Sequence, residues 1–213
     1  ISETAKALWY IYLGLTIIVA LSYKVLGMDW FDAIGHAFST VAIGGFSTHD
    51  DGFGYYDIPA LEGAATLFMA IAGISFALHV LALRSASLRT YLKSSEFRLY
   101  ATILITLLVL YTLGLWLSGT YGSLAEAWRY ASFNAVSYAT TTGFATADFE
   151  AWPPVTKALL FTAMFIGGCA GSTAGGVKCM RIQLMCKHIF SECFRVIHPH
   201  AVVQVKINGK AVE

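Results

Sequence analysis

The stretch TVAIGGFST, residues 40–48, recurs 98 residues later as YATTTGFAT, residues 138–146. Both copies place a glycine before a phenylalanine and a threonine two positions further on, and matches continue on either side. The chain therefore consists of two tandem copies of one unit. Further identical pairs are Trp30/Trp128, Ala33/Ala131, Ala37/Ala135 and Ser39/Ser137, then, with a spacing of 97, Phe68/Phe165, Ser75/Ser172, Ala77/Ala174, Val80/Val177 and Arg84/Arg181.

The composition is that of a membrane protein. Of 213 residues, 57% are hydrophobic and 13% charged, and the mean hydropathy is +0.63. About 20 apolar residues are needed to cross a bilayer as a helix. Apolar runs that approach or exceed this length cover residues 7–26, 60–83 and 99–117, and a fourth begins near 155. We expect an all-α protein embedded in the lipid bilayer, and we exclude a soluble globular domain.

Charges sort to alternate sides of these runs. Basic residues follow the second and fourth runs, so the positive-inside rule places both termini of the chain in the cytoplasm. The opposite side is acidic, which either concentrates cations or merely solvates the loops. The basic residues are Arg84, Arg89, Lys93, Arg98, Lys178, Arg181, Lys187 and Arg195, and the acidic ones are Asp29, Asp32, Asp50, Asp51, Asp57, Glu62, Glu126, Asp148 and Glu150.

Each repeat contains an apolar stretch that is too short to cross the bilayer. These stretches, about 30–40 and 126–139, directly precede the two glycine segments. We predict that they are re-entrant helices which enter from outside and turn back. Backbone that is not helical at membrane depth is tolerated only where protein buries it or where it lines an aqueous path.

The glycine segments are suited to bind a cation through backbone carbonyls. Position 43 carries no side-chain oxygen, so a ligand shared by both copies must come from the backbone. An ordinary turn is the alternative. We expect Phe46 and Phe144 to pack behind the loops, and His36 and Asn134 to brace them by hydrogen bonds. The predicted carbonyl donors are Ile43, Gly44, Gly45, Thr141, Thr142 and Gly143.

The last span is interrupted by GGCAGSTAGG, residues 167–176, whereas its counterpart AIAGISFALH, residues 70–79, holds one glycine and is expected to remain helical. Glycine costs about 1 kcal/mol relative to alanine inside a helix. Close helix packing, a phosphate-binding loop and a flexible intramembrane loop beneath the glycine segments are the alternatives. The phosphate-binding loop is disfavoured because no GK[ST] follows, and the flexible loop is favoured because glycine and serine would let it swing aside.

Four segments carry a resemblance to the Trk/Ktr/HKT superfamily of potassium transporters, closest to the second and third pore repeats of its bacterial TrkH branch. They are FSTVAIGGFSTHD (38–50), YATTTGFAT (138–146), MFIGGCAGSTAGGVK (164–178) and VIHPHAVVQVKINGK (196–210). The resemblance implies potassium-channel-like units, each with a span, pore helix, filter and span. It also implies four units around one ion path. This chain has two and is expected to be a fragment whose remaining repeats lie elsewhere in the parent chain.

The resemblance further implies that K+ is the transported ion, that the chain forms a homodimer and that it binds a cytosolic nucleotide-binding TrkA-type subunit. It implies that the glycine-rich loop is a gate, formed by Gly167, Gly168, Gly171, Ser172, Thr173, Gly175, Gly176 and Lys178. The expected organisation is a first pore repeat over 1–93, a second over 94–195 and a cytoplasmic tail with a hairpin at Asn208-Gly209 over 196–213.

Three classes of function are open to such a chain: ion transport, a secondary carrier and a structural scaffold. Carbonyl-lined ion transport explains the duplicated re-entrant segments, which a structural scaffold leaves unexplained. A secondary carrier with a solute or cation bound at a broken helix is the alternative, but it predicts inverted repeats. The sequence shows no paired carboxylates, Ser/His/Asp set or metal-ligand cluster, so we expect no enzyme, no organic cofactor and no nucleic-acid partner.

Overall fold

The computed structural model describes residues 2–198, 204, 206–207 and 210–211. The prediction of a helical membrane protein is confirmed: within the described residues, the only strands are one short antiparallel pair. The first repeat comprises α1 (Ser2–Val25), α2 (Trp30–Val41), the 3₁₀ turn η1 (Gly52–Tyr56), α3 (Pro59–Ala72), α4 (Phe76–Ser85) and α5 (Arg89–Lys93). The second comprises α6 (Ser95–Leu117), α7 (Leu124–Thr140), η2 (Phe149–Ala151), α8 (Pro154–Ile166) and α9 (Cys179–Ile197).

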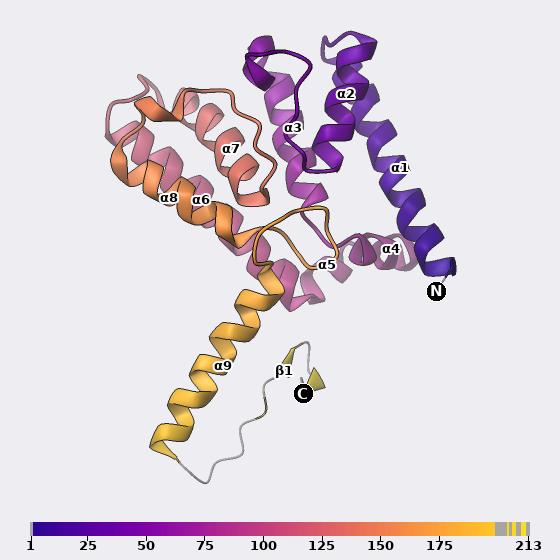
Figure 1. Ribbon diagram of the computed structural model, residues 1–213, viewed down its shortest axis with the longest axis vertical. Coiled ribbons are helices and arrows are strands. Elements are labelled where there is room, and N and C mark those ends of the chain that lie inside the picture. Colours follow the sequence, from indigo (N-terminus) through magenta and orange to yellow (C-terminus); the bar gives the residue numbers. More distant parts are fainter. Residues whose placement is uncertain (1, 199–203, 205, 208–209, 212–213) are drawn as a thin grey trace.

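The two repeats form two neighbouring helical groups, with α1–α3 on one side and α6–α8 on the other (Figure 1). Helix α7 packs against α3 as well as α6 and α8, so it joins the groups. Each group has its own apolar core, and Phe133 and Phe144 of the second repeat extend into the first one. The residues that follow α2 and α7 therefore lie at the junction of the repeats.

Both half-length helices form as predicted. Helix α2 has 12 residues and is preceded by its N-cap Asp29, whose carboxylate accepts the backbone N–H of Asp32 at 2.7 Å. Helix α7 has 17 residues and is preceded by its N-cap Ser123, whose hydroxyl accepts the N–H of Glu126 at 3.1 Å. Such caps satisfy N–H groups that have no partner within the helix. Among the described residues, α1 and α6 contain spans of 23 residues that are long and apolar enough to cross a bilayer.

The expectation that residues 70–79 remain helical is wrong. Helices α3 and α4 meet at a break over Gly73, Ile74 and Ser75 and are bent by 92°. The freed backbone groups bind the second repeat: the carbonyl of Gly73 accepts the N–H of Cys169 at 2.8 Å, and the carbonyl of Gly171 accepts the N–H of Phe76 at 3.0 Å. The last span is therefore broken in both repeats. The second repeat supplies the hydrogen-bond partners for the backbone groups that the break in the first repeat leaves free.

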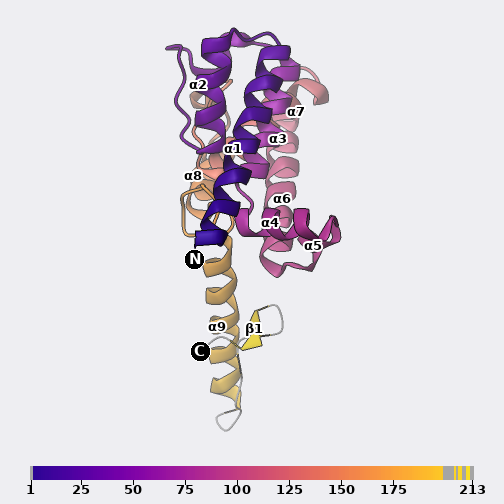
Figure 2. The same cartoon turned by 90° about the vertical axis from the view of Figure 1, so that its right-hand side faces the viewer.

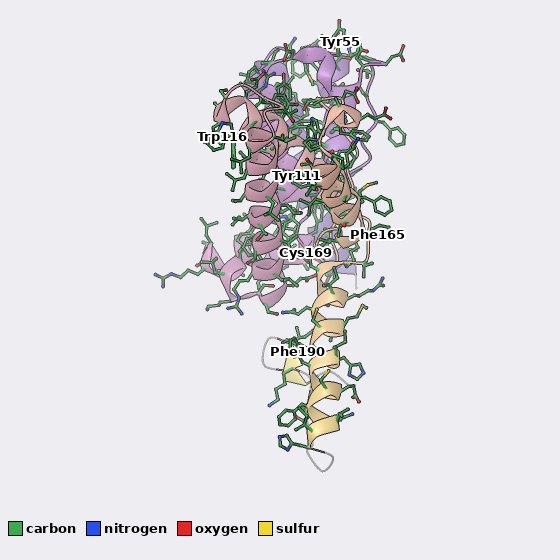
Figure 3. The ribbon with its side chains drawn as sticks, turned by 90° about the vertical axis from the view of Figure 1, so that its left-hand side faces the viewer. Tyr55, Tyr111, Trp116, Phe165, Cys169 and Phe190 are labelled. Atoms are coloured by element: carbon green, nitrogen blue, oxygen red, sulfur yellow. The ribbon has the colours of Figure 1, made fainter. Side chains whose placement is uncertain are left out.

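Helix α9 projects away from both groups of helices (Figures 1 and 2). Figure 3 shows Phe190 on this projecting helix, well away from Tyr111 and Cys169 among the packed helices. Beyond it, β1 (Lys206–Ile207) pairs antiparallel with β2 (Lys210–Ala211). This pairing is that of the predicted hairpin, although its turn at 208–209 lies outside the described residues.

Candidate functional site

The segments at the carboxyl-terminal ends of α2 and α7, residues 42–46 and 140–144 and here called the filter loops, share one unusual backbone pattern. Ile43 and Thr141 have positive φ angles of 55° and 67°, and Gly45 and Gly143 have 68° and 92°. A positive φ is an outlier for a β-branched residue such as isoleucine or threonine, and such strain persists only where surrounding structure enforces it. The same alternation of positive φ angles therefore recurs in both segments, at positions 98 residues apart.

The two filter loops lie against each other. A Cβ atom on Gly45 would lie 2.0 Å from the carbonyl oxygen of Thr142 and 3.1 Å from the carbonyl carbon of Gly143. Only glycine fits this close approach. Gly45 therefore lies against Thr142 and Gly143, so the two predicted rows of carbonyl donors are in contact at their glycine ends.

Hydrogen bonds behind the second filter loop hold its shape. The hydroxyl of Ser137 donates to the carbonyl of Phe144 at 2.7 Å, and the hydroxyls of Thr140 and Thr142 are bonded at 2.7 Å. The N–H of Thr142 donates to the carbonyl of Ser137 at 2.8 Å. Phe144 is 1% exposed and packs against Phe53, as predicted for the aromatic residue behind the loop.

The first filter loop is backed differently. The expectation that Phe46 packs behind it is wrong, because this side chain is 80% exposed. His36, which is fully buried, lies behind the loop instead and contacts the ring of Phe53. Its Nε2 is hydrogen-bonded to the hydroxyl of Ser47 at 2.9 Å, while Nδ1 meets the backbone carbonyl of Asp32 at 2.8 Å.

The predicted bracing roles of His36 and Asn134 are confirmed. Asn134 occupies the position of His36 in the second repeat, and its amide donates to the carbonyl of Tyr130 at 2.8 Å and to the hydroxyl of Thr146 at 3.2 Å. Both side chains therefore tie a half-length helix to the segment that follows it, at Ser47 and Thr146.

A carboxylate adds charge to the first brace. Asp32, in the outer first turn of α2, accepts from Thr48 at 2.6 Å and is paired with His49 at 2.9 Å. Burial opposes ionisation of Asp32, but hydrogen bonds from Thr48, Tyr56 and His49 outweigh it and lower its pKa to about 2. This brace is ionic, whereas the second is neutral.

Residues 167–178, here called the intramembrane loop, run from α8 beneath both filter loops to α9 (Figure 1). The hydroxyl of Thr173 donates to the carbonyl of Val41, at the end of α2, at 2.7 Å. The N–H of Gly175 donates to the hydroxyl of Thr141 in the second filter loop, also at 2.7 Å. With the bonds to Gly73 and Phe76, the loop touches both pore units.

Glycines form the narrow part of this loop, where its two ends meet. A Cβ on Gly167 would lie 2.1 Å from the carbonyl oxygen of Gly175, and one on Gly176 would lie 2.8 Å from the Cα of Gly167. Both have φ angles of 73°. The ammonium group of Lys178 donates a hydrogen bond to the carbonyl of Ala174 within the loop. All eight predicted gate residues therefore belong to one compact segment.

The sequence reasoning missed two acidic residues. Glu62, expected at an acidic outer mouth, is 3% exposed and accepts Nε and Nη2 of Arg129 at 2.8 and 2.7 Å, which joins α3 to α7. Glu96, assigned to a basic inner segment, is 6% exposed and contacts the intramembrane loop. Its position as the single acid among Arg84, Arg89, Lys93 and Arg98 was the available signal.

Comparison with known proteins gives consistent results. The family model for TrkH, described as a cation transport protein, matches residues 1–213. A Trk system potassium uptake protein TrkH from Halomonas elongata is 50% identical over 212 residues, which are 100% of this chain and 44% of that protein. The corresponding protein of Escherichia coli K12 is 45% identical with the same coverage.

A solved structure is also similar. The crystal structure of the potassium transporter TrkH from Vibrio parahaemolyticus matches with a TM-score of 0.95 and 45% identity, covering 99% of this chain and 46% of that one. The chain thus spans less than half the length of the relatives that it matches.

Proposed function

Because this chain belongs to the TrkH family of cation transport proteins, we propose that it supplies two of the four pore units of a potassium-uptake protein. The pore units are residues 1–93 and 94–195, followed by a cytoplasmic tail over 196–213. The remaining repeats of the parent chain complete the filter. Relatives that are named potassium uptake proteins cover the full length of this chain, which supports K+ as the cargo.

The observation that carries this proposal is the pair of filter loops with matching positive φ at positions 43/141 and 45/143. Carbonyl oxygens of Ile43, Gly44, Gly45, Thr141, Thr142 and Gly143 face the ion path and replace water around K+. The barrier to crossing the bilayer falls because the ion exchanges one shell of oxygen atoms for another. This process is transport without chemical catalysis or an organic cofactor.

The intramembrane loop is the gate. Its contacts with Val41 and Thr141, at the ends of the two half-length helices, support this role, because each is a single neutral hydrogen bond that can break when the loop moves. Displacement of Gly171–Gly176 opens the path, while Lys178 stays at the start of α9. Glycine and serine allow this movement since they tolerate many backbone conformations.

The protein lies in the bacterial inner membrane, with the basic ends of α4 and α9 in the cytoplasm. It works as a homodimer, and a nucleotide-binding TrkA-type subunit contacts the cytoplasmic side, where α9 projects from the pore units. The name "Trk system" of the relatives supports assembly with further components.

Rubidium uptake tests this function in bacteria that lack their own potassium uptake and express the complete chain carrying these residues. We expect Gly143→Ser to lower the preference for potassium over sodium and deletion of 168–175 to raise uptake. If both variants reach the membrane and transport like the wild type, the filter loops are only turns and the glycines only packing. The alternative interpretation, a carrier that binds its solute at the broken helices, would then replace the interpretation as a pore.

A further inference from the structure

Glu96 has an unusual environment for a carboxylate. It lies in the first turn of α6, at the basic end of that helix, and is buried. One of its oxygens, Oε1, accepts the backbone N–H of Ala170 at 2.5 Å and that of Met180 at 3.2 Å. A buried charge is retained only where hydrogen bonds and opposite charge compensate its lost hydration.

The two donors belong to opposite ends of the intramembrane loop. Ala170 lies near its start, and Met180 lies in the first turn of α9, where backbone N–H groups lack intrahelical partners and favour an anion. The ammonium of Lys178 interacts electrostatically with Glu96 and also donates to the carbonyl of Ala174. A single carboxylate therefore connects both ends of the loop.

Backbone pairing reinforces this junction. The carbonyls of Phe165, Ile166 and Gly168 accept the N–H groups of Val177, Lys178 and Cys179 at 2.9, 3.0 and 3.0 Å. We call these two paired segments, 165–170 and 177–180, the neck, and residues 171–176 the tip. The bonds to the Glu96 carboxylate that hold the neck are charge-assisted and roughly twice as strong as neutral ones. Neutral bonds from Thr173 and Gly175 attach the tip to Val41 and Thr141. Lys178 connects the tip to the neck through the carbonyl of Ala174.

We infer that Glu96 clamps the neck, so that the gate opens by movement of the tip alone. This inference rests on the proposed gate function and specifies how that gate is positioned. The alternative movement, in which α8, the loop and α9 straighten into one helix, breaks the clamp. The backbone nitrogens of Ala170 and Met180 are bound to one oxygen atom and therefore lie no more than about 6 Å apart. In a continuous helix, the rise per residue would separate the two residues by about 15 Å along the axis.

Glu96→Gln tests the clamp in the complete chain. The amide keeps the shape of the side chain but removes its negative charge. The hydrogen bonds that hold the neck then weaken, and the ammonium of Lys178 loses the opposite charge beside it. We expect the leak of rubidium through the closed gate to rise about tenfold, because the closed state loses a hydrogen bond to a charged group. The rubidium/sodium preference should stay unchanged because the filter loops are untouched. Glu192→Gln removes the same charge from the exposed face of α9 and should leave both values at wild-type levels.

Thiol labelling separates clamping from a merely structural role. Ser172→Cys reports on the tip and Ala170→Cys on the neck, each in a background with the exposed Cys186 and Cys193 changed to serine. In inside-out vesicles with a methanethiosulfonate reagent, we expect the tip to react faster than the neck while Glu96 is present. Glu96→Gln should then bring the neck close to the rate of the tip.

Several outcomes would overturn the clamp. Glu96→Gln at normal membrane abundance with wild-type leak and labelling is one. Equal labelling of tip and neck with Glu96 present is another, and it decides the matter even if Glu96→Gln fails to reach the membrane. If Gly143→Ser and the loop deletion behave as proposed while Glu96→Gln does not, only the clamp is wrong. If those two variants also transport like the wild type, the gate itself is wrong.

Discussion

The two filter loops have the same backbone but different surroundings. Ile43 and Gly45 repeat the positive φ angles of Thr141 and Gly143. The first loop is braced by His36 and an ionised Asp32, whereas the second is braced by the neutral Asn134. Duplication has thus preserved the backbone shape that an ion would contact and left the supporting side chains free to differ.

The difference extends beyond the braces. The second pore helix carries Arg129, which is bound to Glu62 and Asp57 of the first repeat, where the first pore helix has the exposed Phe31. The second loop also offers the intramembrane loop a hydroxyl, which Ile43 lacks. The second repeat therefore connects the first repeat, through Arg129, with the intramembrane loop, through Thr141.

The largest effect is expected at Arg129. Arg129→Met keeps the length of the side chain but leaves the buried Glu62 without its bidentate partner, which costs about 3–5 kcal/mol of stability. Thermal unfolding of the purified complete chain should therefore occur at a clearly lower temperature. Phe31→Met, at the matching position of the first repeat, should change little because Phe31 is 75% exposed.

A second substitution checks the cause. Glu62→Gln combined with Arg129→Met removes the unpaired charge and should recover most of the lost stability. If Arg129→Met alone unfolds at the wild-type temperature, Arg129 does not join the repeats energetically.

The next effect concerns the filter glycines. A methyl group on Gly45 meets the carbonyl oxygen of Thr142, and the left-handed backbone alone costs an alanine about 1–2 kcal/mol, so Gly45→Ala should lower rubidium uptake at least about tenfold. Gly143 has no atom of the described residues within 4 Å of such a methyl group. In a four-unit pore, however, a third filter loop lies beside it, as the second lies beside Gly45.

Gly143→Ala therefore tests whether a third loop is present beside Gly143. We expect uptake by this variant to fall as far as that of Gly45→Ala, measured at equal membrane abundance. A clearly milder loss for Gly143→Ala would mean that no further loop approaches it, which contradicts the four-unit arrangement.

The repeat, the half-length helices and the broken last span could be predicted because each is encoded locally, in a spacing, a run length or a cluster of glycines. The bend at Gly73 could not, since one glycine is compatible with a helix and the break depends on hydrogen bonds with Cys169, which donates, and Gly171, which accepts, nearly a hundred residues away. The exposure of Phe46 and the burial of Glu62 likewise depend on tertiary neighbours. The carbonyl ligands and the gate remain predictions.

The smallest effect is expected where the second filter loop meets the gate. Thr141→Val keeps a β-branched side chain but removes the hydroxyl that accepts the N–H of Gly175. A neutral hydrogen bond contributes about 0.5–1.5 kcal/mol, so the open gate should become about two- to tenfold more populated. Rubidium efflux from loaded proteoliposomes should rise by that factor. Ile43→Val, a matched change in the loop without a hydroxyl, should leave efflux unchanged. If instead both variants leak equally, the strained backbone shared by the two loops holds the gate closed, and the asymmetry between the loops has no part in gating.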